Sequence, residues 1–272
     1  MRQFSVAARI RRLSPGGTMR RLANVHDARS FSNSRRTRRF EAFAGLVDDL
    51  QRQSSRPLRI LDIGGRSSFW EQRGWSARQD IRIVIVNLEA ELAKEETGRP
   101  AYDNIEMRAG DATDLSAFPD QSFDIVFSNS VIEHLETFER QSAMASEVRR
   151  LAPQYWIQTP NFWFPVEPHF LTPFWHWLPV NVRVALLRRH RWGWCGPCAD
   201  LDEARSLVLE HRLMRATELR GLFPGATLTR ERIGPFVKSF VAVCGPAAAA
   251  PAGARASGAS TSRGHSRVRR GR

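Results

Sequence analysis

The chain has 272 residues, 42% of them apolar, which suits a single α/β domain with a sizeable core. Its formal net charge is +13, but residues 1–39 contribute +10 and residues 245–272 contribute +6, so residues 40–244 are slightly acidic at −3. This distribution argues against a wide nucleic-acid groove on the body of the protein. No apolar run is long enough to cross a membrane.

The two ends of the chain lack any pattern that would bury an apolar face. We therefore predict a disordered basic arm over residues 1–33 and a disordered basic tail over residues 245–272, on either side of a domain over residues 34–244. The first forty residues also have the Arg-rich, acid-poor composition of a mitochondrial transit peptide. Because arginine is frequent throughout the chain, a bacterial cytoplasmic protein is the favoured interpretation and a mitochondrial one the alternative.

The first predicted element is a helix that begins at Ser34, its expected N-cap, and packs one apolar face on a sheet. That face consists of Phe40, Phe43, Ala44, Leu46, Val47 and Leu50. Five strands then alternate with helices, which predicts a parallel sheet covered on both faces. The strands are expected at residues 58–63, 81–87, 104–108, 123–128 and 155–159, and the helices between them at about 67–73, 91–96 and 139–151. After Leu213 we expect a short helix and two strands, at 226–233 and 236–243, joined by Gly234-Pro235.

Residues 161–212 form an insert between the fifth strand and the final pair. Six of the eight tryptophans fall within residues 156–194, and prolines break the segment into turns. Ligands in open α/β sheets bind at the carboxyl ends of the strands, so this aromatic segment is placed to cover a pocket. We predict an aromatic lid that contacts a substrate through Asn161, Trp163 and His169. The alternative is a cap that only buries the edge of the sheet.

One short motif in the insert invites a different interpretation. Trp194-Cys195-Gly196-Pro197-Cys198 matches the active-site pentapeptide of thioredoxins. That chemistry needs the first cysteine at a helix N-terminus directly after a core strand, whereas Val182–Trp192 is better interpreted as a helix, with Asp200 or Asp202 capping the next one. A thiol redox protein therefore stays only as the least favoured alternative. No metal site is predicted, because zinc would need two further ligands and only His190 and His211 are candidates.

The centre of the chain is the turn that follows the first strand, Asp62-Ile63-Gly64-Gly65. A buried strand that ends in a glycine turn and leads into a helix presents free backbone N–H groups at the edge of a sheet, where nucleotide-like ligands bind. The later stretches Ile81–Glu89, Gly110–Leu115, Ser122–Leu135 and Tyr155–Asn161 follow it at regular intervals.

In this order the set resembles the class I S-adenosylmethionine-dependent methyltransferases, in particular the group that methylates small molecules. The resemblance covers about residues 34–243. It implies a Rossmann-like α/β fold, with a mostly parallel seven-stranded sheet, helices on both faces and an antiparallel last strand. It departs from the family at the glycine loop, where Gly-x-Gly-x-Gly is replaced by Gly64-Gly65-Arg66-Ser67-Ser68.

The resemblance also implies a role for each matched position. Asp62, Gly64 and Gly65 would lie under the methionine part of S-adenosylmethionine. The carboxylate that holds the ribose is replaced by Asn87, with Glu89 the nearest acid. The remaining positions are Asp111 and Ala112 at the adenine, and Ser128 and Asn129 where the fourth strand opens towards the substrate.

These roles predict methyl transfer to a small-molecule acceptor, a hydroxyl in a glycan or natural product being favoured. A hydroxyl must lose its proton, and His134 and His169, with Glu133 beside the first, are the candidate bases. Two alternatives stay open: a nucleic-acid methyltransferase that uses its Arg-rich tails, and a methyltransferase-like protein that binds without turnover. Peripheral membrane contact through the insert is also conceivable, and the oligomeric state is not indicated.

Overall fold

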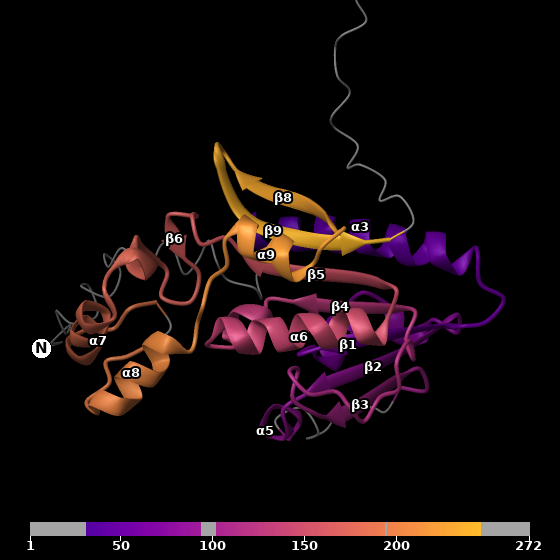
Figure 1. Cartoon of the computed structure of the whole chain (residues 1–272), viewed down its shortest axis with the longest axis horizontal. Helices are drawn as coiled ribbons and strands as arrows, with labels where there is room; N and C mark the ends of the chain where they lie inside the picture. Colours follow the sequence, from indigo (N-terminus) through magenta and orange to yellow (C-terminus); the bar gives the residue numbers. More distant parts are fainter. Residues whose placement is uncertain (1–30, 94–101, 194, 246–272) are drawn as a thin grey trace, which may run out of the picture.

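The computed structural model describes residues 31–93, 102–193 and 195–245 (Figure 1). The arm predicted over residues 1–33 therefore lies outside the described residues up to residue 30, and the tail predicted over residues 245–272 lies outside them from residue 246. No helix in the described ranges has the length and apolar character needed to cross a membrane.

Within the described residues, seven strands form one sheet in the order β3-β2-β1-β4-β5-β9-β8. The strands β1 to β5 are parallel neighbours, whereas β9 runs antiparallel to both β5 and β8. Their bounds are β1 Leu58–Ile63, β2 Ile81–Asn87, β3 Ile105–Ala109, β4 Ile125–Asn129, β5 Gln154–Pro160, β8 Thr227–Ile233 and β9 Phe236–Cys244. The expected Rossmann-like fold is confirmed, including its antiparallel end.

Helices cover both faces of this sheet, and Figure 1 shows α6 in front of it and α3 behind it. The front helices are α6 (Phe138–Leu151) and α9 (Ala216–Leu222), which pack Met144, Val148 and Leu219 on the strands. Thr137 caps α6 by accepting a hydrogen bond from the N–H of Arg140. The other face is covered by α3 (Phe31–Gln51), α4 (Ser67–Glu71) and the 3-10 turn η1 (Trp75–Ala77). After β2 comes α5 (Glu89–Leu92), and after β4 the 3-10 turn η2 (Ile132–His134).

The first helix differs from its prediction at one end. α3 begins at Phe31, so Ser34 lies within the helix and the prediction that Ser34 caps it is wrong. The predicted apolar face is confirmed: Phe43, Leu46 and Val47 are buried, and the other three residues pack against the same cluster. Burial of this face on the sheet, rather than a local capping signal, determines where the helix lies.

An aromatic cluster fills the space between α3 and the sheet. Phe43, Trp70 and Phe127 pack with ring centroids 4.6–6.1 Å apart, and Trp75 and Trp156 complete the cluster. Trp70 is fully buried, and its Nε1 donates a hydrogen bond of 2.7 Å to Oδ2 of Asp62. Because Asp62 ends β1, this bond links the aromatic cluster to the glycine turn.

The insert forms a lobe with its own small core. It contains β6 (Val166–Glu167), β7 (Thr172–Pro173), the 3-10 turn η3 (Trp175–Trp177), α7 (Val180–Arg189) and α8 (Leu201–Leu209). Its core consists of Phe170, Trp175, Val184, Leu187, Cys198, Ala204 and Val208. In Figure 1 the lobe lies beyond the carboxyl ends of the parallel strands, where β5 leaves the sheet. The helix expected before the cysteine motif is confirmed as α7, and Asp200 caps α8 by accepting a hydrogen bond from the N–H of Glu203.

Candidate functional site

The glycine turn after β1 is packed so closely that no side chain fits. A Cβ on Gly64, whose φ is +72°, would lie 2.5 Å from Cγ2 of Val131, and a Cβ on Gly65 would lie 1.7 Å from Oδ2 of Asp62. The side-chain amide of Asn87 donates a hydrogen bond of 3.2 Å to the carbonyl of Gly65. The turn is thus held between the ends of β1, β2 and β4. Because its two glycines have no side chains, a ligand can approach its backbone closely.

A cavity of about 840 Å³ lies above this turn, within the size range of small-molecule sites. Its walls come from the carboxyl ends of β1, β2, β3 and β4 and from α8 in the insert. Five of the predicted site residues line it: Gly64, Asn87, Asp111, Ala112 and His134. Residues far apart in the sequence therefore meet at the edge of the sheet that the motifs predicted.

Asp111 is held as an ionised acceptor. Its Oδ1 accepts hydrogen bonds of 2.8 Å from the backbone N–H and the hydroxyl of Thr113, and its Oδ2 lies 3.0 Å from Nη2 of Arg140. Burial acts to raise the pKa of Asp111, but the bonds from Thr113 and Arg140 outweigh it, so the pKa is lowered. A carboxylate in this state accepts hydrogen bonds from a ligand without first losing a proton.

The acidic residue that lines the larger cavity together with Asn87 differs from the one predicted from the sequence. Glu91 lines the cavity, whereas the predicted Glu89 is exposed and does not line either described cavity. Glu91 pairs with Arg66 at 3.2 Å, so one of the residues that replaces a family glycine reaches across the cavity mouth. The sequence could not distinguish the two acids, because the direction of each side chain depends on where the first turn of α5 begins.

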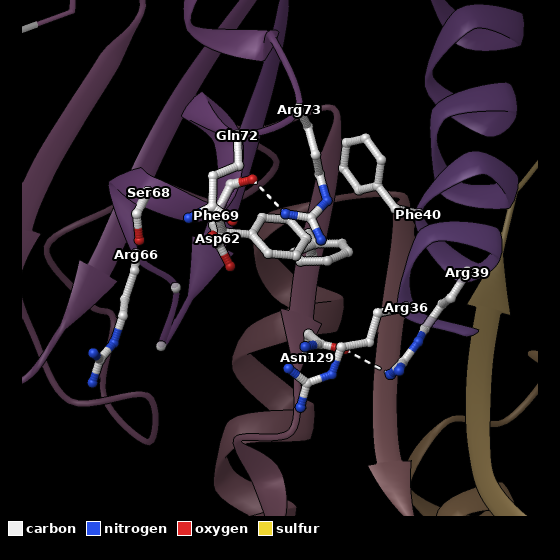
Figure 2. Close-up of a pocket in the computed structure, with 13 residues that line it drawn as sticks. Arg36, Arg39, Phe40, Asp62, Arg66, Ser68, Phe69, Gln72, Arg73 and Asn129 are labelled. Carbon is white, nitrogen blue, oxygen red and sulfur yellow. Dashed lines mark hydrogen bonds between the residues drawn. The ribbon is translucent and has the colours of Figure 1, made fainter. Parts of the chain in front are cut away.

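A second cavity, of about 710 Å³, lies on the other side of the glycine turn (Figure 2). It contains the predicted residues Asp62, Gly64, Gly65 and Asn129, and three arginines that sequence reasoning missed. These are Arg36 and Arg39 from α3 and Arg73 from the loop after α4. Gly64 and Arg66 line both cavities, which therefore flank one turn.

The three arginines make this second cavity positive. Nη1 of Arg39 donates a 2.7 Å hydrogen bond to Oδ1 of Asn129, and its Nε lies 3.1 Å from a carboxylate oxygen of Glu231 on β8. The guanidinium of Arg73 lies over the ring of Phe69 at 3.8 Å. Burial lowers the pKa of all three arginines, and the charge of Arg39 adds to this at Arg36. A negatively charged group entering the cavity would relieve this repulsion.

The side chains of Ser128 and Ser130 lie in different surroundings. It is fully buried between β1 and β4, and its hydroxyl donates a hydrogen bond of 3.2 Å to the carbonyl of Ile63, so it does not line either of the two described cavities. Ser130, two residues on, lines the larger cavity with φ at +60°. Strand alternation would place both serines on the same face, but β4 ends at Asn129 and the positive φ at Ser130 turns the chain, so the two side chains diverge.

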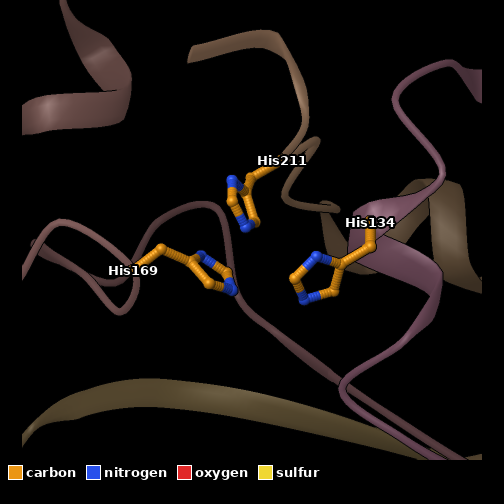
Figure 3. Close-up of side chains that lie close together, drawn as sticks. All are labelled: His134, His169 and His211. Atoms are coloured by element: carbon orange, nitrogen blue, oxygen red, sulfur yellow. The ribbon is translucent and has the colours of Figure 1, made fainter. Parts of the chain in front are cut away.

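Three histidines meet where the insert approaches the sheet (Figure 3). His134 follows β4, His169 follows β6 and His211 follows α8, and one ring nitrogen of each lies within 4.8 Å of the other two. The rings of His169 and His211 stack with centroids 3.7 Å apart, and His134 lies edge-on to both. Since His134 also lines the larger cavity, the cluster forms part of its wall on the insert side.

Two buried carboxylates and a partly exposed one lie around this cluster. Glu167 is 2% exposed; its Oε1 lies 2.7 Å from Nδ1 of His169, and its Oε2 accepts backbone N–H bonds from His169 and Phe170. Glu133 is fully buried and accepts a hydrogen bond of 3.1 Å from the hydroxyl of Thr159. Glu210 lies 3.8 Å from Nδ1 of His134.

The electrostatics of the cluster follow from this burial. Burial and the neighbouring His169 lower the pKa of His134 to about 4. Burial and the two neighbouring histidines, His169 and His134, lower the pKa of His211 to about 2. For His169 burial acts in the same direction, but the bond to Glu167 outweighs it and the pKa is raised. Burial raises the pKa of Glu133 to about 7. The imidazoles of His134 and His211 are thus neutral at neutral pH, with lone pairs available.

The other two predicted substrate contacts lie apart from this group. The amide of Asn161 donates to the carbonyl of Val237 at 2.8 Å, and its Oδ1 accepts the N–H of Trp163 at 3.1 Å. Trp163 is 58% exposed, with the guanidinium of Arg215 over its ring at 5.6 Å. Neither residue lines either of the two described cavities, so their contact with a substrate stays a prediction.

The cysteine motif has the wrong surroundings for thiol exchange. Trp194 lies outside the described residues, and Cys195 follows a turn after α7 rather than a core strand. Burial raises the pKa of the Cys195 thiol, as do the carboxylates of Glu210 and Glu167, and burial with Glu203 raises that of Cys198. Reactive thioredoxin-type cysteines have the opposite shift, to a pKa of about 7.

We therefore expect both thiols to remain protonated at neutral pH. Alkylation by iodoacetamide, followed by mass spectrometry of the peptide that contains both cysteines, should accelerate steadily as the pH rises beyond about 8.5, because only the thiolate reacts. A rate that levels off near pH 7 would show a lowered pKa and restore the redox interpretation. The separate peptide that contains Cys244 serves as the internal comparison.

Comparison with known proteins agrees with this geometry. A family described as "Methyltransferase domain" matches residues 61–154, which run from β1 to the start of β5. Two uncharacterised proteins from two strains of Mycobacterium tuberculosis are 35% identical over 72 residues, which is 26% of this chain. The chain spans about a quarter of the length of these relatives, 24% of each.

Solved structures resemble the chain at low sequence identity. A possible exported protein from Bordetella parapertussis is 14% identical with a TM-score of 0.50, over 89% of this chain and 84% of that one. Human N-acetylserotonin methyltransferase, solved in complex with S-adenosylmethionine, is 13% identical with a TM-score of 0.45, over 90% of this chain and 61% of that one. Residues 61–154 are thus similar to a methyltransferase domain, and the order of the sheet agrees with the Rossmann-like fold of such domains.

Proposed function

We propose that this protein transfers the methyl group of S-adenosylmethionine to a small-molecule acceptor, with a hydroxyl as the favoured acceptor group. The observation that carries the proposal is the pair of cavities on either side of the glycine turn, lined by the residues that the family motifs predict. Together they accommodate an elongated ligand with an aromatic base at one end and charged groups at the other.

The cofactor would cross the turn at Gly64 and Gly65. Its adenosine part would lie in the larger cavity, with the adenine amino group near Asp111 and Ala112 and the ribose hydroxyls near Asn87 and Glu91. Its methionine carboxylate would face the arginines of the smaller cavity, which offer charge-assisted hydrogen bonds. Arg66 and Ser68, at the two positions where the family has glycine, both line the smaller cavity.

The acceptor would enter from the insert side, where His134 lines the larger cavity. In-line displacement at a sulfonium methyl requires the acceptor oxygen to be held against that methyl and its proton to be removed. We assign this activation to the histidine cluster, with His134 and His169 as the predicted bases and Glu133 behind them. Glycan and natural-product acceptors, and the cytoplasmic location, stay predictions.

The nucleic-acid alternative depends on the Arg-rich ends, which lie outside the described residues. It predicts RNA or DNA binding that falls steeply with salt, because phosphate contacts release counterions. The alternative of binding without turnover predicts a ligand in the larger cavity other than the cofactor. Titration of S-adenosylhomocysteine separates the proposal from binding without turnover, whereas the nucleic-acid methyltransferase would bind it too and is tested by the salt dependence of RNA or DNA binding.

The test is calorimetric titration of S-adenosylhomocysteine into the full chain. We expect micromolar binding to the wild type and binding about 10- to 100-fold weaker to Asp111→Ala, because a hydrogen bond to a charged group contributes about 1.5–3 kcal/mol. Asp120→Ala, which removes an exposed carboxylate outside both cavities, should bind as the wild type does. Absence of binding to folded wild type would overturn the cofactor site and leave the non-catalytic alternative.

A further inference from the structure

The histidine cluster has the composition and convergence of a metal site. His134 comes from the core domain, whereas His169 and His211 come from two separate segments of the insert. The three imidazole rings come from three different segments and, among the described residues, form no hydrogen bond with each other. Their contact alone therefore contributes little to the stability of the fold. A cation bound between them would account for the arrangement.

The surroundings of the cluster supply negative charge and orientation. Oε1 of Glu167 lies 2.7 Å from Nδ1 of His169, which leaves Nε2 of that ring for a metal. A buried carboxylate that fixes the tautomer of a ligating histidine is the usual outer partner in zinc sites. Glu210 lies 3.8 Å from His134, and the charges of Glu133 and Glu210 both act on His169. The carboxylates of Glu167 and Glu210 compensate the charge of a divalent cation, and a bound cation would favour ionisation of the nearby Glu133.

We propose that His134, His169 and His211 bind a divalent transition metal, zinc being the best match, at the junction of the insert and the sheet. Imidazole nitrogen suits zinc, and three protein ligands leave a fourth position open. Zinc–nitrogen bonds of about 2.0–2.1 Å place tetrahedral ligands about 3.3 Å apart. The ring nitrogens, now within 4.8 Å of one another, would have to approach by at most about 1.5 Å.

A metal bound at this location would have two effects. It joins the insert to the core domain, so that binding fixes the wall that α8 contributes to the larger cavity. Because His134 lines that cavity, a bound metal would lie at its wall and would take an oxygen or nitrogen donor of the acceptor, polarising it as a Lewis acid. The metal would then replace the imidazoles as the activating group, since their lone pairs would be bound to it. The second effect rests on the proposed methyl transfer, whereas the metal site itself does not.

The experiment measures metal and cofactor binding separately on the full chain. After dialysis against a chelator, Zn²⁺ is titrated by calorimetry and bound metal is counted by atomic emission, with one ion per chain expected. Co²⁺ is then used as a spectroscopic probe, and its visible spectrum should lack the sulfur-to-cobalt charge-transfer band that Cys195 and Cys198 would produce. Binding of S-adenosylhomocysteine to each sample is measured in parallel.

Variants separate the ligands from other metal-binding groups. His169→Ala and His134→Ala should each weaken Zn²⁺ binding at least about 100-fold, and His134 is exposed enough that its loss should leave folding intact. Glu167→Gln should weaken it about 10- to 100-fold, since an amide can donate to Nδ1 and thereby place the proton on Nε2. The exposed His190→Ala and the double change Cys195→Ser with Cys198→Ser should bind Zn²⁺ as the wild type does.

The outcomes are distinct for the two proposals. Failure of the folded wild type to bind Zn²⁺ or Co²⁺, or equal binding by His134→Ala, overturns the metal site whatever the cofactor does. Loss of Zn²⁺ in the variants with unchanged S-adenosylhomocysteine binding supports the metal site and leaves the cofactor site intact. Stoichiometric Zn²⁺ without any S-adenosylhomocysteine binding supports the metal site and overturns the proposed function.

Discussion

Replacing Gly65 by alanine is expected to abolish measurable S-adenosylhomocysteine binding, with a loss of at least about 100-fold, or about 2.7 kcal/mol. The new Cβ would lie 1.7 Å from Oδ2 of Asp62. Either Asp62 must leave its bond to Trp70, or the turn must move away from the ligand. Since the proposed cofactor lies across this turn, both adjustments displace the backbone groups that would contact it. Calorimetry on folded protein measures the loss.

The matched control is Gly45→Ala in α3, where an added Cβ meets nothing within 4 Å. It should leave the affinity unchanged and stabilise the protein by about 0.5–1 kcal/mol, because glycine is unfavourable within a helix. Circular dichroism and thermal unfolding verify that Gly65→Ala is folded. If folded Gly65→Ala bound within threefold of the wild type, the cofactor would not cross this turn.

The largest effect on stability is expected for Trp70→Ala, at about 3–5 kcal/mol of unfolding free energy. Trp70 is fully buried among Phe43, Trp75 and Phe127, so truncation leaves a cavity in a packed aromatic cluster. The substitution also removes the Nε1 donor from Asp62, which is 1% exposed. Urea denaturation of the wild type and the variant gives the difference directly.

Trp70→Phe separates the two contributions, because it retains most of the ring and removes only the donor. We expect a loss of about 1–3 kcal/mol from the weakened pairing of the buried carboxylate. Trp163→Ala, at a tryptophan that is 58% exposed, should change the stability by less than about 1 kcal/mol. Equal effects of Trp70→Ala and Trp163→Ala would refute the packing argument.

Much of the fold was predictable because its signals are local and repetitive. β1 and β2 have the predicted bounds, since each is a short buried apolar run ended by polar residues. β3 and β4 are displaced by one or two residues from their predictions, as expected at strand ends where pairing partners decide the boundary. The helix expected over residues 91–96 is observed as α5, Glu89–Leu92, and residues 94–96 lie outside the described ranges.

The candidate site was predictable only where a motif fixes a position relative to a strand end. Gly64 follows β1 directly, Asn87 is the last residue of β2 and Asp111 lies two residues after β3, and each lines a cavity. Arg36 and Arg39 could not be predicted, because they belong to a helix that precedes the sheet and carry no pattern beyond a basic sequence. His211 acquires its place only when the insert folds against η2, a long-range contact without a sequence signature.

Arg39 on α3 contacts both Asn129 on β4 and Glu231 on β8, so it joins segments from the beginning, the middle and the end of the described chain. During synthesis, residues 31–160 emerge from the ribosome with the glycine turn and the arginines already made, but without Glu231, the ion-pair partner of Arg39. The ion pair that orients Arg39 therefore forms only when the last hairpin joins β5. A ribosome-bound chain that ends before β8 would carry the motif residues and still lack this contact.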